Sequence, residues 1–134
     1  MATKPETAFI QTVHRRLKKQ TNPPLIKKLA DRFTNGLPDV LYISPSGITL
    51  WVEYKVHPNK TTPIQQLTLE ILMAYHQRVA VITKTPNSSQ IFDGVYQHDN
   101  DKPWDWILDQ LGYNHTATTT SLNTITKTIP KETP

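Results

Sequence analysis

Two acidic residues and a lysine lie close to the ends of two expected neighbouring strands. Asp39 directly precedes the apolar run VLYI, and Glu53 and Lys55 are two residues apart near the end of ITLWVEYKV. Residues two apart on a strand share one face, so Glu53 and Lys55 point the same way, about 7 Å apart along the strand. Carboxylate oxygens are ligands that magnesium prefers, and a nearby lysine can orient a metal-bound water or stabilise negative charge on a phosphate. The alternative is a surface Glu–Lys pair, which contributes almost no stability.

A predicted hairpin brings these three residues together. Asn35-Gly36 and Pro38 mark a turn, after which one strand is expected from Asp39 to Ile43 and a returning strand from Ile48 to Val56. The segment SPSG between the two strands is typical of a tight reversal. Alternate residues of the returning strand are apolar, which predicts that one face is buried and that the charged residues lie on the other.

Helices are expected before and after this hairpin. An amphipathic helix begins near Thr3 and ends at QTNPP, and a second short helix is predicted over Leu25–Phe33. After Thr62-Pro63, apolar residues at a period of 3.6 predict a helix that ends near Gln77. The apolar run VAVIT follows as a buried strand, and the order strand, helix, strand favours a parallel crossover.

The last part of the chain divides into a helix and a tail. Asp101 is predicted to cap a helix that has Pro103 in its first turn and Gly112 just past its end. Residues 87–100 receive no assignment. Eight of the last nineteen residues are threonine, so we expect one domain over residues 1–115 and a Thr-rich tail over residues 116–134.

The order of these features resembles that of a known superfamily. G-L-P-D, a hairpin and an apolar strand that ends in E-Y-K are similar to the active-site signature of the PD-(D/E)xK phosphodiesterases. T-P-I-Q, an amphipathic helix and the strand R-V-A-V-I resemble the stand-alone VRR-NUC nucleases, over roughly residues 5–84. The resemblance implies an α/β fold with a restriction-endonuclease-like core, in which helices flank a central mixed β-sheet. The sequence departs from the family at His76-Gln77, where a glycine is usual.

The resemblance also implies roles for single residues. Asp39 and Glu53 would bind Mg²⁺ or Mn²⁺ together with the backbone carbonyl of Tyr54, and Lys55 would assist the attacking water. Gln65 matches the glutamine that starts the next helix in the family and would hold Lys55 or the phosphate. Gln66 is the competing choice for this role.

Glu6 matches the acidic residue that the superfamily often carries on its first helix. It shares a stripe with Ile10, Val13 and Leu17, so it is expected to point inward, where a bound metal ion would satisfy its charge. The alternative is a capping box formed by Thr3 and Glu6 at the start of the helix.

Positive charge is concentrated in the first part of the chain. Residues 1–34 carry eight lysines and arginines against two acids, whereas the whole chain has a net charge of +4. This asymmetry suits a polyanion such as nucleic acid, although a solvated helix face would give the same pattern. The predicted nucleic-acid-binding residues are Arg15, Arg16, Lys18, Lys19, Lys27 and Lys28, and His14 is expected at the same surface.

Composition excludes several kinds of site. The chain has no cysteine, so any metal must be held by oxygen or histidine. No apolar run approaches the roughly 20 residues that span a bilayer, and the amino terminus has no secretion signal. We therefore expect a soluble protein in the cytoplasm of a bacterial or phage-infected host, with no membrane partner.

These features predict a Mg²⁺-dependent endonuclease that cuts branched, flapped or four-way junction DNA. The residues do not distinguish DNA from RNA. The alternative is a non-catalytic protein of the same fold that binds nucleic acid or a host factor. Symmetric cutting of a junction needs two sites, so a homodimer is expected, with Trp104 or Trp106 as a candidate contact.

Overall fold

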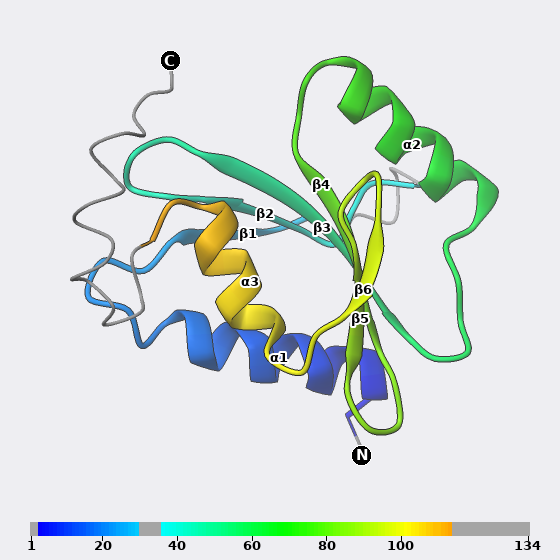
Figure 1. Cartoon of the computed structure of the whole chain (residues 1–134), viewed down its shortest axis with the longest axis horizontal. Coiled ribbons are helices and arrows are strands. Elements are labelled where there is room, and N and C mark those ends of the chain that lie inside the picture. The colour runs from blue at the N-terminus through cyan, green and yellow to red at the C-terminus, as the bar shows by residue number, and fades with distance from the viewer. Residues whose placement is uncertain (1–2, 30–35, 114–134) are drawn as a thin grey trace.

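Six strands form one mixed β-sheet, and helices lie against both of its faces (Figure 1). The computed structural model describes residues 3–29 and 36–113. The elements are α1 (Pro5–Leu17), β1 (Leu25–Lys28), β2 (Val40–Ile43), β3 (Thr49–Val56), α2 (Pro63–Ala74), β4 (Val79–Lys84), β5 (Ser89–Phe92), β6 (Gln97–Asp99) and α3 (Pro103–Gln110). The strands are ordered β1 to β6 across the sheet. β3 and β4 are parallel, and the other neighbouring pairs in the described residues are antiparallel.

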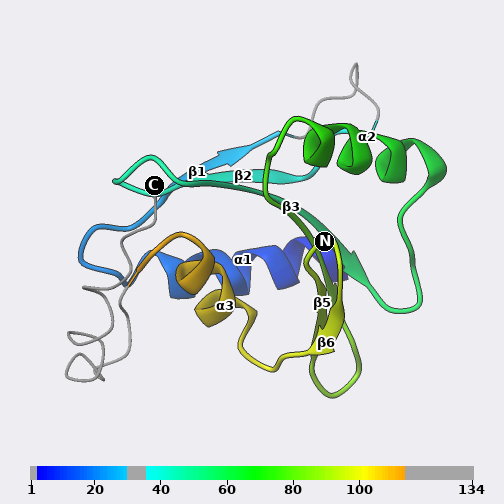
Figure 2. The ribbon, with the colours of Figure 1, turned by 45° about the horizontal axis from the view of Figure 1, so that its top comes forward.

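The two faces of the sheet are covered unequally. α1 and α3 pack side by side on one face, and α2 lies alone on the other (Figure 2). α2 connects the parallel strands β3 and β4, as the order of elements in the sequence predicted. The expected α/β architecture, with a mixed sheet between helices, is therefore confirmed.

The core lies between the sheet and the layer formed by α1 and α3. α1 turns Phe9, Val13 and Leu17 toward the sheet, because residues four apart lie on one side of a helix. The apolar stripe of β3 faces these residues, as expected from its alternation. The fully buried partners from the sheet and α3 are Val40, Tyr42, Leu50, Val52, Tyr54, Ala80, Ile82, Ile91, Ile107 and Leu108.

The helix predicted over Leu25–Phe33 is wrong in the part that the structure describes. Leu25–Lys28 is strand β1, which pairs antiparallel with β2, and residues 30–33 lie outside the described residues. The two prolines that precede β1 favour extended backbone, and the free edge of β2 supplies hydrogen-bond partners to an extended chain. The N–H of Leu29 then donates to the carbonyl of Asp39 at 2.8 Å, which ties the end of β1 to the start of β2.

Helices α2 and α3 differ from expectation only at their ends. α2 starts at Thr62-Pro63 as predicted, with Thr62 as its cap, and it ends at Ala74, before the expected Gln77. His76 follows with φ of 63°, a conformation that favours glycine, at the position where the family usually has one. α3 begins after Lys102 and not after Asp101, because the side chain of Asn100 accepts the Lys102 N–H at 2.9 Å.

Residues 87–100, which the sequence left unassigned, contain the β5–β6 hairpin at the edge of the sheet. None of the helices in the described ranges is long and apolar enough to cross a membrane. The expected Thr-rich tail over 116–134 lies outside the described residues.

Candidate active site

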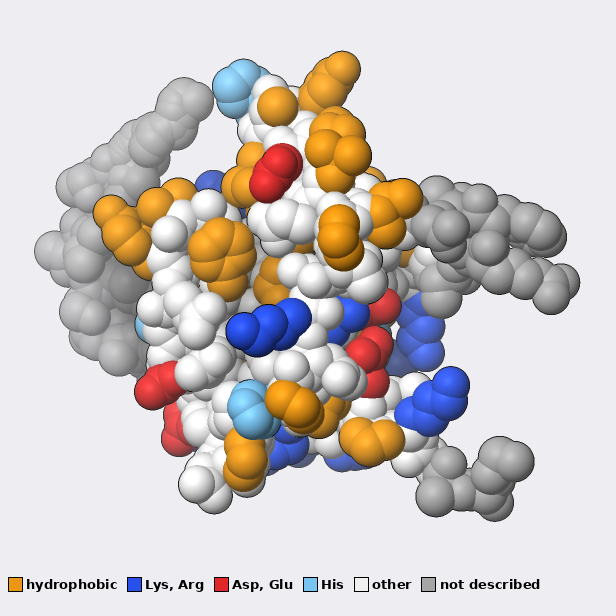
Figure 3. Space-filling view, turned by 90° about the vertical axis from the view of Figure 1, so that its right-hand side faces the viewer, with side chains coloured by type: hydrophobic (Ala, Val, Ile, Leu, Met, Phe, Trp, Pro, Cys, Tyr) orange, Lys and Arg blue, Asp and Glu red, His pale blue; other side chains and the backbone are white. Residues whose placement is uncertain are grey.

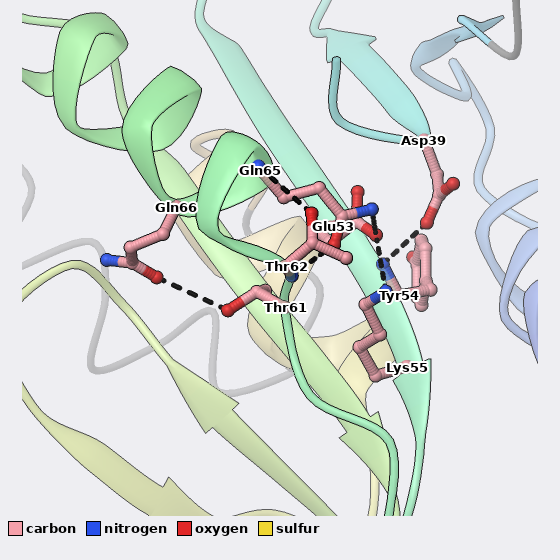
Figure 4. Close-up of polar contacts among 8 residues, drawn as sticks. All are labelled: Asp39, Glu53, Tyr54, Lys55, Thr61, Thr62, Gln65 and Gln66. Carbon is pink, nitrogen blue, oxygen red and sulfur yellow. Dashed lines mark hydrogen bonds and ion pairs between the residues drawn. The ribbon is translucent and has the colours of Figure 1, made fainter. Parts of the chain in front are cut away.

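Asp39 stands one residue before β2 and is held by the next strand. Its Oδ2 accepts a hydrogen bond from the backbone N–H of Tyr54 at 2.7 Å (Figure 4). The pairing of Val40 with Val52 places Asp39 opposite Glu53 when the same register is continued by one residue. The N–H and C=O of a strand residue face the same edge, so the Tyr54 carbonyl also faces the side where Asp39 lies. The hairpin therefore brings Asp39 and Glu53 together as the sequence predicted.

Glu53 is buried, and only one of its carboxylate oxygens is satisfied. The residue is 2% exposed, and its Oε2 lies 2.9 Å from Gln65 Nε2 and 3.5 Å from Lys55 Nζ (Figure 4). Its Oε1 is buried and has no hydrogen-bond partner among the described residues. A buried carboxylate oxygen without a partner is costly, unless a ligand such as a metal ion binds it.

Burial raises the pKa of the acidic residues around this point, and neighbouring acids add to the effect at Glu53 and Glu6. Burial and, to a smaller extent, the charge of Asp39 raise the pKa of Glu53 to about 8, although Lys55 lowers it. Burial also raises the pKa of Asp39, against the opposing effects of the Tyr54 N–H and of Lys55. The charged forms of Glu53 and Asp39 are therefore disfavoured in the metal-free protein, and a bound divalent cation would stabilise them.

Gln65 is oriented by the start of α2. Its Oε1 accepts the N–H of Thr62 at 2.9 Å, while its own N–H donates to Thr62 Oγ1 at 3.2 Å, and together these bonds form a capping box. Because its carbonyl oxygen is used in this way, its NH₂ group is turned toward Glu53 (Figure 4). The sequence predicted a bond to Lys55 or the phosphate, whereas the structure gives a bond to Glu53.

Gln66, the competing choice, is directed elsewhere. Its Oε1 accepts a hydrogen bond from Thr61 at 3.3 Å, and its Nε2 donates to Glu70 at 3.4 Å. Of the two glutamines, only Gln65 therefore contacts the acidic pair in the described residues.

Glu6 lies near the pair without completing it. Lys4 caps α1 with no side-chain hydrogen bond, so the alternative capping box between Thr3 and Glu6 does not form. Glu6 is half-buried, and its pKa is raised by burial and then by the charge of Asp39, with Lys55 opposing. Across residues 3–29 and 36–113, however, no three acidic or histidine side chains converge into a metal-binding group.

The site fits a hard divalent cation on the chemistry of its donors. It offers the unpartnered oxygen of Glu53, the carboxylate of Asp39 and the backbone edge at Tyr54. Two carboxylates with few other protein ligands suit magnesium, which keeps several of its waters.

The predicted basic residues separate onto different surfaces. A groove between α1 and β1 is lined by Arg15, Lys18 and Lys28. Arg16 instead lies over the ring of Trp104 on α3, with its Cζ 4.7 Å from the ring centroid. Lys27 is next to Lys28 on a strand, so it points to the opposite face. The six residues therefore do not form one continuous patch.

His14 is a correction to the sequence-based expectation of a surface residue. It is 5% exposed, and its Nε2 lies 2.8 Å from the hydroxyl of Tyr42, which in turn lies 2.6 Å from the hydroxyl of Tyr54. Burial lowers the pKa of His14 to about 4, with smaller effects from Lys28 and Lys18. The sequence did carry a signal for this burial, because His14 lies four residues after Ile10 and three before Leu17 on the inner side of α1.

Comparisons with known proteins agree with this architecture. No protein-family model matches the chain, and no curated protein matches it. Among solved structures it is similar to a VRR_NUC domain, with a TM-score of 0.57 and 21% identity over 83% of this chain and 100% of that domain. It also aligns with Hjc, a Holliday junction resolvase from the archaeal hyperthermophile Archaeoglobus fulgidus, with a TM-score of 0.48 and 13% identity over 75% and 92% of the two chains. The chain has the restriction-endonuclease-like fold of the PD-(D/E)xK nucleases, as its sequence led us to expect.

Proposed function

We propose that this protein is a metal-dependent endonuclease that hydrolyses phosphodiester bonds in DNA. The observation that carries the proposal is the buried Glu53, which has one oxygen without a partner beside Asp39 and Lys55. A buried glutamate beside a half-buried aspartate and a lysine costs stability, and a catalytic role would explain why these residues stand together on the α2 face of the sheet. The fold, which is that of a VRR_NUC domain, supports the same reaction class.

Each residue has a role that follows from its contacts. Asp39, Glu53 and the Tyr54 carbonyl would hold the ion, and Gln65 orients Glu53 through its hydrogen bond to Oε2. Bound Mg²⁺ or Mn²⁺ would polarise the phosphate and lower the pKa of a coordinated water. Lys55, whose side chain is 12% exposed and whose Nζ lies 3.5 Å from Glu53 Oε2, would orient the attacking water and stabilise the negative charge on the phosphate. Glu6 lies close enough to interact with the charge of Asp39, so its carboxylate would add to the negative potential that attracts the ion.

The surface favours recognition of DNA shape over recognition of sequence. Arg15, Lys18 and Lys28 line one groove and suit phosphates, which position a duplex but carry no sequence information. We infer that the substrate is branched, flapped or four-way junction DNA, cut by a homodimer that makes paired incisions.

Incubation with end-labelled linear, flapped and four-way DNA tests this function. With Mg²⁺ or Mn²⁺ the protein should cut the branched substrates, and a chelator should stop the reaction. Glu53→Gln should abolish cleavage and leave DNA affinity largely intact, whereas Asp109→Asn, which alters an exposed carboxylate on α3, should cut normally. Turnover by Glu53→Gln in excess chelator would contradict the proposal.

A further inference from the structure

A cavity lies beside the candidate active site, on the face of the sheet that α2 covers. Its volume is about 470 Å³, and Lys55 lines it. This Lys55 cavity is within the size range of ligand pockets, which is roughly 300–1,000 Å³. Because Lys55 Nζ lies 3.5 Å from Glu53 Oε2, the cavity is next to the residues that would hold the metal ion.

The floor of the Lys55 cavity is formed by side chains in rows that cross the sheet. Glu53 pairs with Val81, and Val81 pairs with Phe92, so these three residues point to the same face. Neighbouring strands are about 4.8 Å apart, which places Phe92, two strands away, roughly 10 Å from Glu53. The half-buried ring of Phe92 lines the cavity. It is therefore within reach of the nucleotides that flank a phosphate bound at Glu53.

The walls of the Lys55 cavity carry positive charge and amide groups. Lys60, from the loop after β3, joins Lys55, and none of the described residues that line the cavity is acidic. On the side of β5 and β6, Gln97 Nε2 donates a hydrogen bond to Gln90 Oε1 at 3.1 Å. Figure 3 views the molecule from the side of the loop after β3 and shows Lys and Arg side chains next to Asp and Glu side chains near the centre. Basic and acidic groups are therefore adjacent here, as a metal site and a bound polyanion require.

An aromatic floor with lysines beside it suits a nucleobase. Bases of any sequence stack on aromatic rings, while nearby lysines follow the phosphate backbone. A phosphate by itself would gain nothing from a floor made of Val81 and Phe92. A base inside a duplex is already stacked on both sides, so only a base that has left its stack can lie on Phe92.

We propose that the Lys55 cavity holds an unstacked base next to the phosphate that is cut, and that this base stacks on Phe92. The proposal rests on the nuclease function proposed above and states how that site selects its substrate. A branch point offers bases that are unpaired or easily unstacked, whereas a linear duplex must first break its stacking. Phe92 is then a specificity residue that favours branched over linear DNA.

Photocrosslinking tests the contact without requiring cleavage. Flapped DNA with iododeoxyuridine at successive positions around the branch point is bound to the Glu53→Gln protein and irradiated, because iodouracil crosslinks to an aromatic ring on which it stacks. We expect a crosslink from a position at the branch point, in a peptide that contains Phe92. Adding Phe92→Leu should remove this crosslink. Adding Tyr96→Leu, which removes a 73% exposed ring from the β5–β6 turn, should leave it unchanged.

Abasic substrates test whether the same contact selects the DNA that is cut. In the wild type, an abasic nucleotide at the crosslinked position should lower kcat/KM about tenfold, which is the order of effect of one stacked base. Phe92→Leu should cut the intact flap about tenfold more slowly, and the abasic nucleotide should slow it no further, because both changes remove one contact. Phe92→Tyr, which keeps a ring, should behave as the wild type does.

Absence of a crosslink to Phe92 from every position would overturn the proposal, and the crosslinked peptide decides this even where Phe92→Leu does not fold. An abasic nucleotide that slows Phe92→Leu as much as the wild type would also overturn it. A protein that crosslinks through Phe92 but cuts no DNA with Mg²⁺ or Mn²⁺ would support the base site and contradict the nuclease function.

Discussion

At the scale of single residues, Glu53 is a carboxylate in a position that opposes folding. The folded protein must either keep a charge in a buried position or take up a proton, because the pKa of Glu53 is raised to about 8. Sites that bind ions commonly have this character, since the ion supplies the missing interaction. Stability in the absence of metal is therefore a direct probe of the site.

Glu53→Gln should stabilise the metal-free protein while it abolishes cleavage. In chelator at pH 8, we expect the free energy of unfolding to rise by roughly 1–3 kcal/mol, as measured by urea denaturation. The raised pKa disfavours folding above the ordinary pKa of glutamate, so the gain should shrink as the pH falls toward 4.5. Asp109→Asn is the control, and a destabilised Glu53→Gln protein would contradict the assigned cost of the carboxylate.

His14 should make stability depend on pH in the opposite direction. Its pKa is lowered to about 4 in the folded protein, so its neutral form stabilises the fold fully above about pH 6.5, and this contribution is lost as the pH falls toward 4. The loss should be about 2–3 kcal/mol between pH 7 and pH 4. Urea denaturation of the wild type and of His14→Gln at pH 7 and at pH 4 measures this loss. The contribution of His14 is the difference between the two proteins in the free energy of unfolding that is lost from pH 7 to pH 4. His57→Gln, at an exposed position, should lose as much free energy of unfolding between pH 7 and pH 4 as the wild type does.

At the scale of elements, α1 and β1 together make the basic groove. Arg15 comes from the last turn of α1, Lys18 is the residue that caps its C-terminal end, and Lys28 comes from a strand that pairs with β2. The neighbouring basic residues Arg16, Lys19 and Lys27 do not line this groove. Two variants can therefore be compared that remove the same number of charges from inside and from outside the groove.

Replacing Arg15, Lys18 and Lys28 with glutamine should flatten the salt dependence of DNA binding. Each lost phosphate contact reduces the steepness of log affinity against log salt by about 0.9. The slope of the triple variant should therefore be shallower than that of the wild type by roughly 2–3. The matched triple variant of Arg16, Lys19 and Lys27 removes the same charge from other surfaces and should keep most of the slope. Equal losses in the two variants would show that the groove has no special role.

Gly36 links the turn before β2 to α2. It has φ of +89°, and an added Cβ would lie 2.9 Å from Thr68 Oγ1 and 3.0 Å from the Ile64 carbonyl. Gly36→Ala should therefore lower stability by about 2 kcal/mol or more, through backbone strain and crowding. Gly47→Ala is the control, because Gly47 has a similar φ of +92° and nothing within 4 Å. Thermal unfolding of both variants separates the crowding from the strain, and equal losses would contradict a tight contact at Gly36.

At the scale of the whole molecule, one face of the sheet packs the hydrophobic core and the other carries the candidate active site. The face under α1 and α3 holds the core, whereas the face under α2 holds the acidic pair. α2 also leaves an apolar stripe exposed, formed by Ile64, Leu67, Ile71 and Tyr75. A monomer would therefore have its catalytic residues next to its least-covered helix.

A dimer should convert a four-way junction extruded from supercoiled plasmid directly into linear DNA. Two sites on one complex cut both strands within one binding event, whereas a monomer releases nicked circles first. Agarose gels of a time course distinguish these products. Nicked circles that accumulate before linear DNA would contradict paired cutting.

The sequence by itself determined the elements whose signals are local. Helical periodicity and the prolines and glycines at the ends gave α1, α2 and α3, and alternation with a tight turn gave β2 and β3. The proximity of Asp39 to Glu53 and Lys55 followed as well, because a four-residue reversal fixes the register of the hairpin within a short stretch of chain.

The tertiary structure alone decided what depends on distant partners. β1 is a strand because the edge of β2 pairs with it, although its own sequence also fits a helix. His14 is buried because Tyr42, 28 residues away, accepts or donates its hydrogen bond. The stripe on α2 is exposed because the sheet beneath it takes up only Leu69. Periodicity shows that a helix has an apolar side, but which surface meets that side depends on the packing of the whole chain, or of two chains.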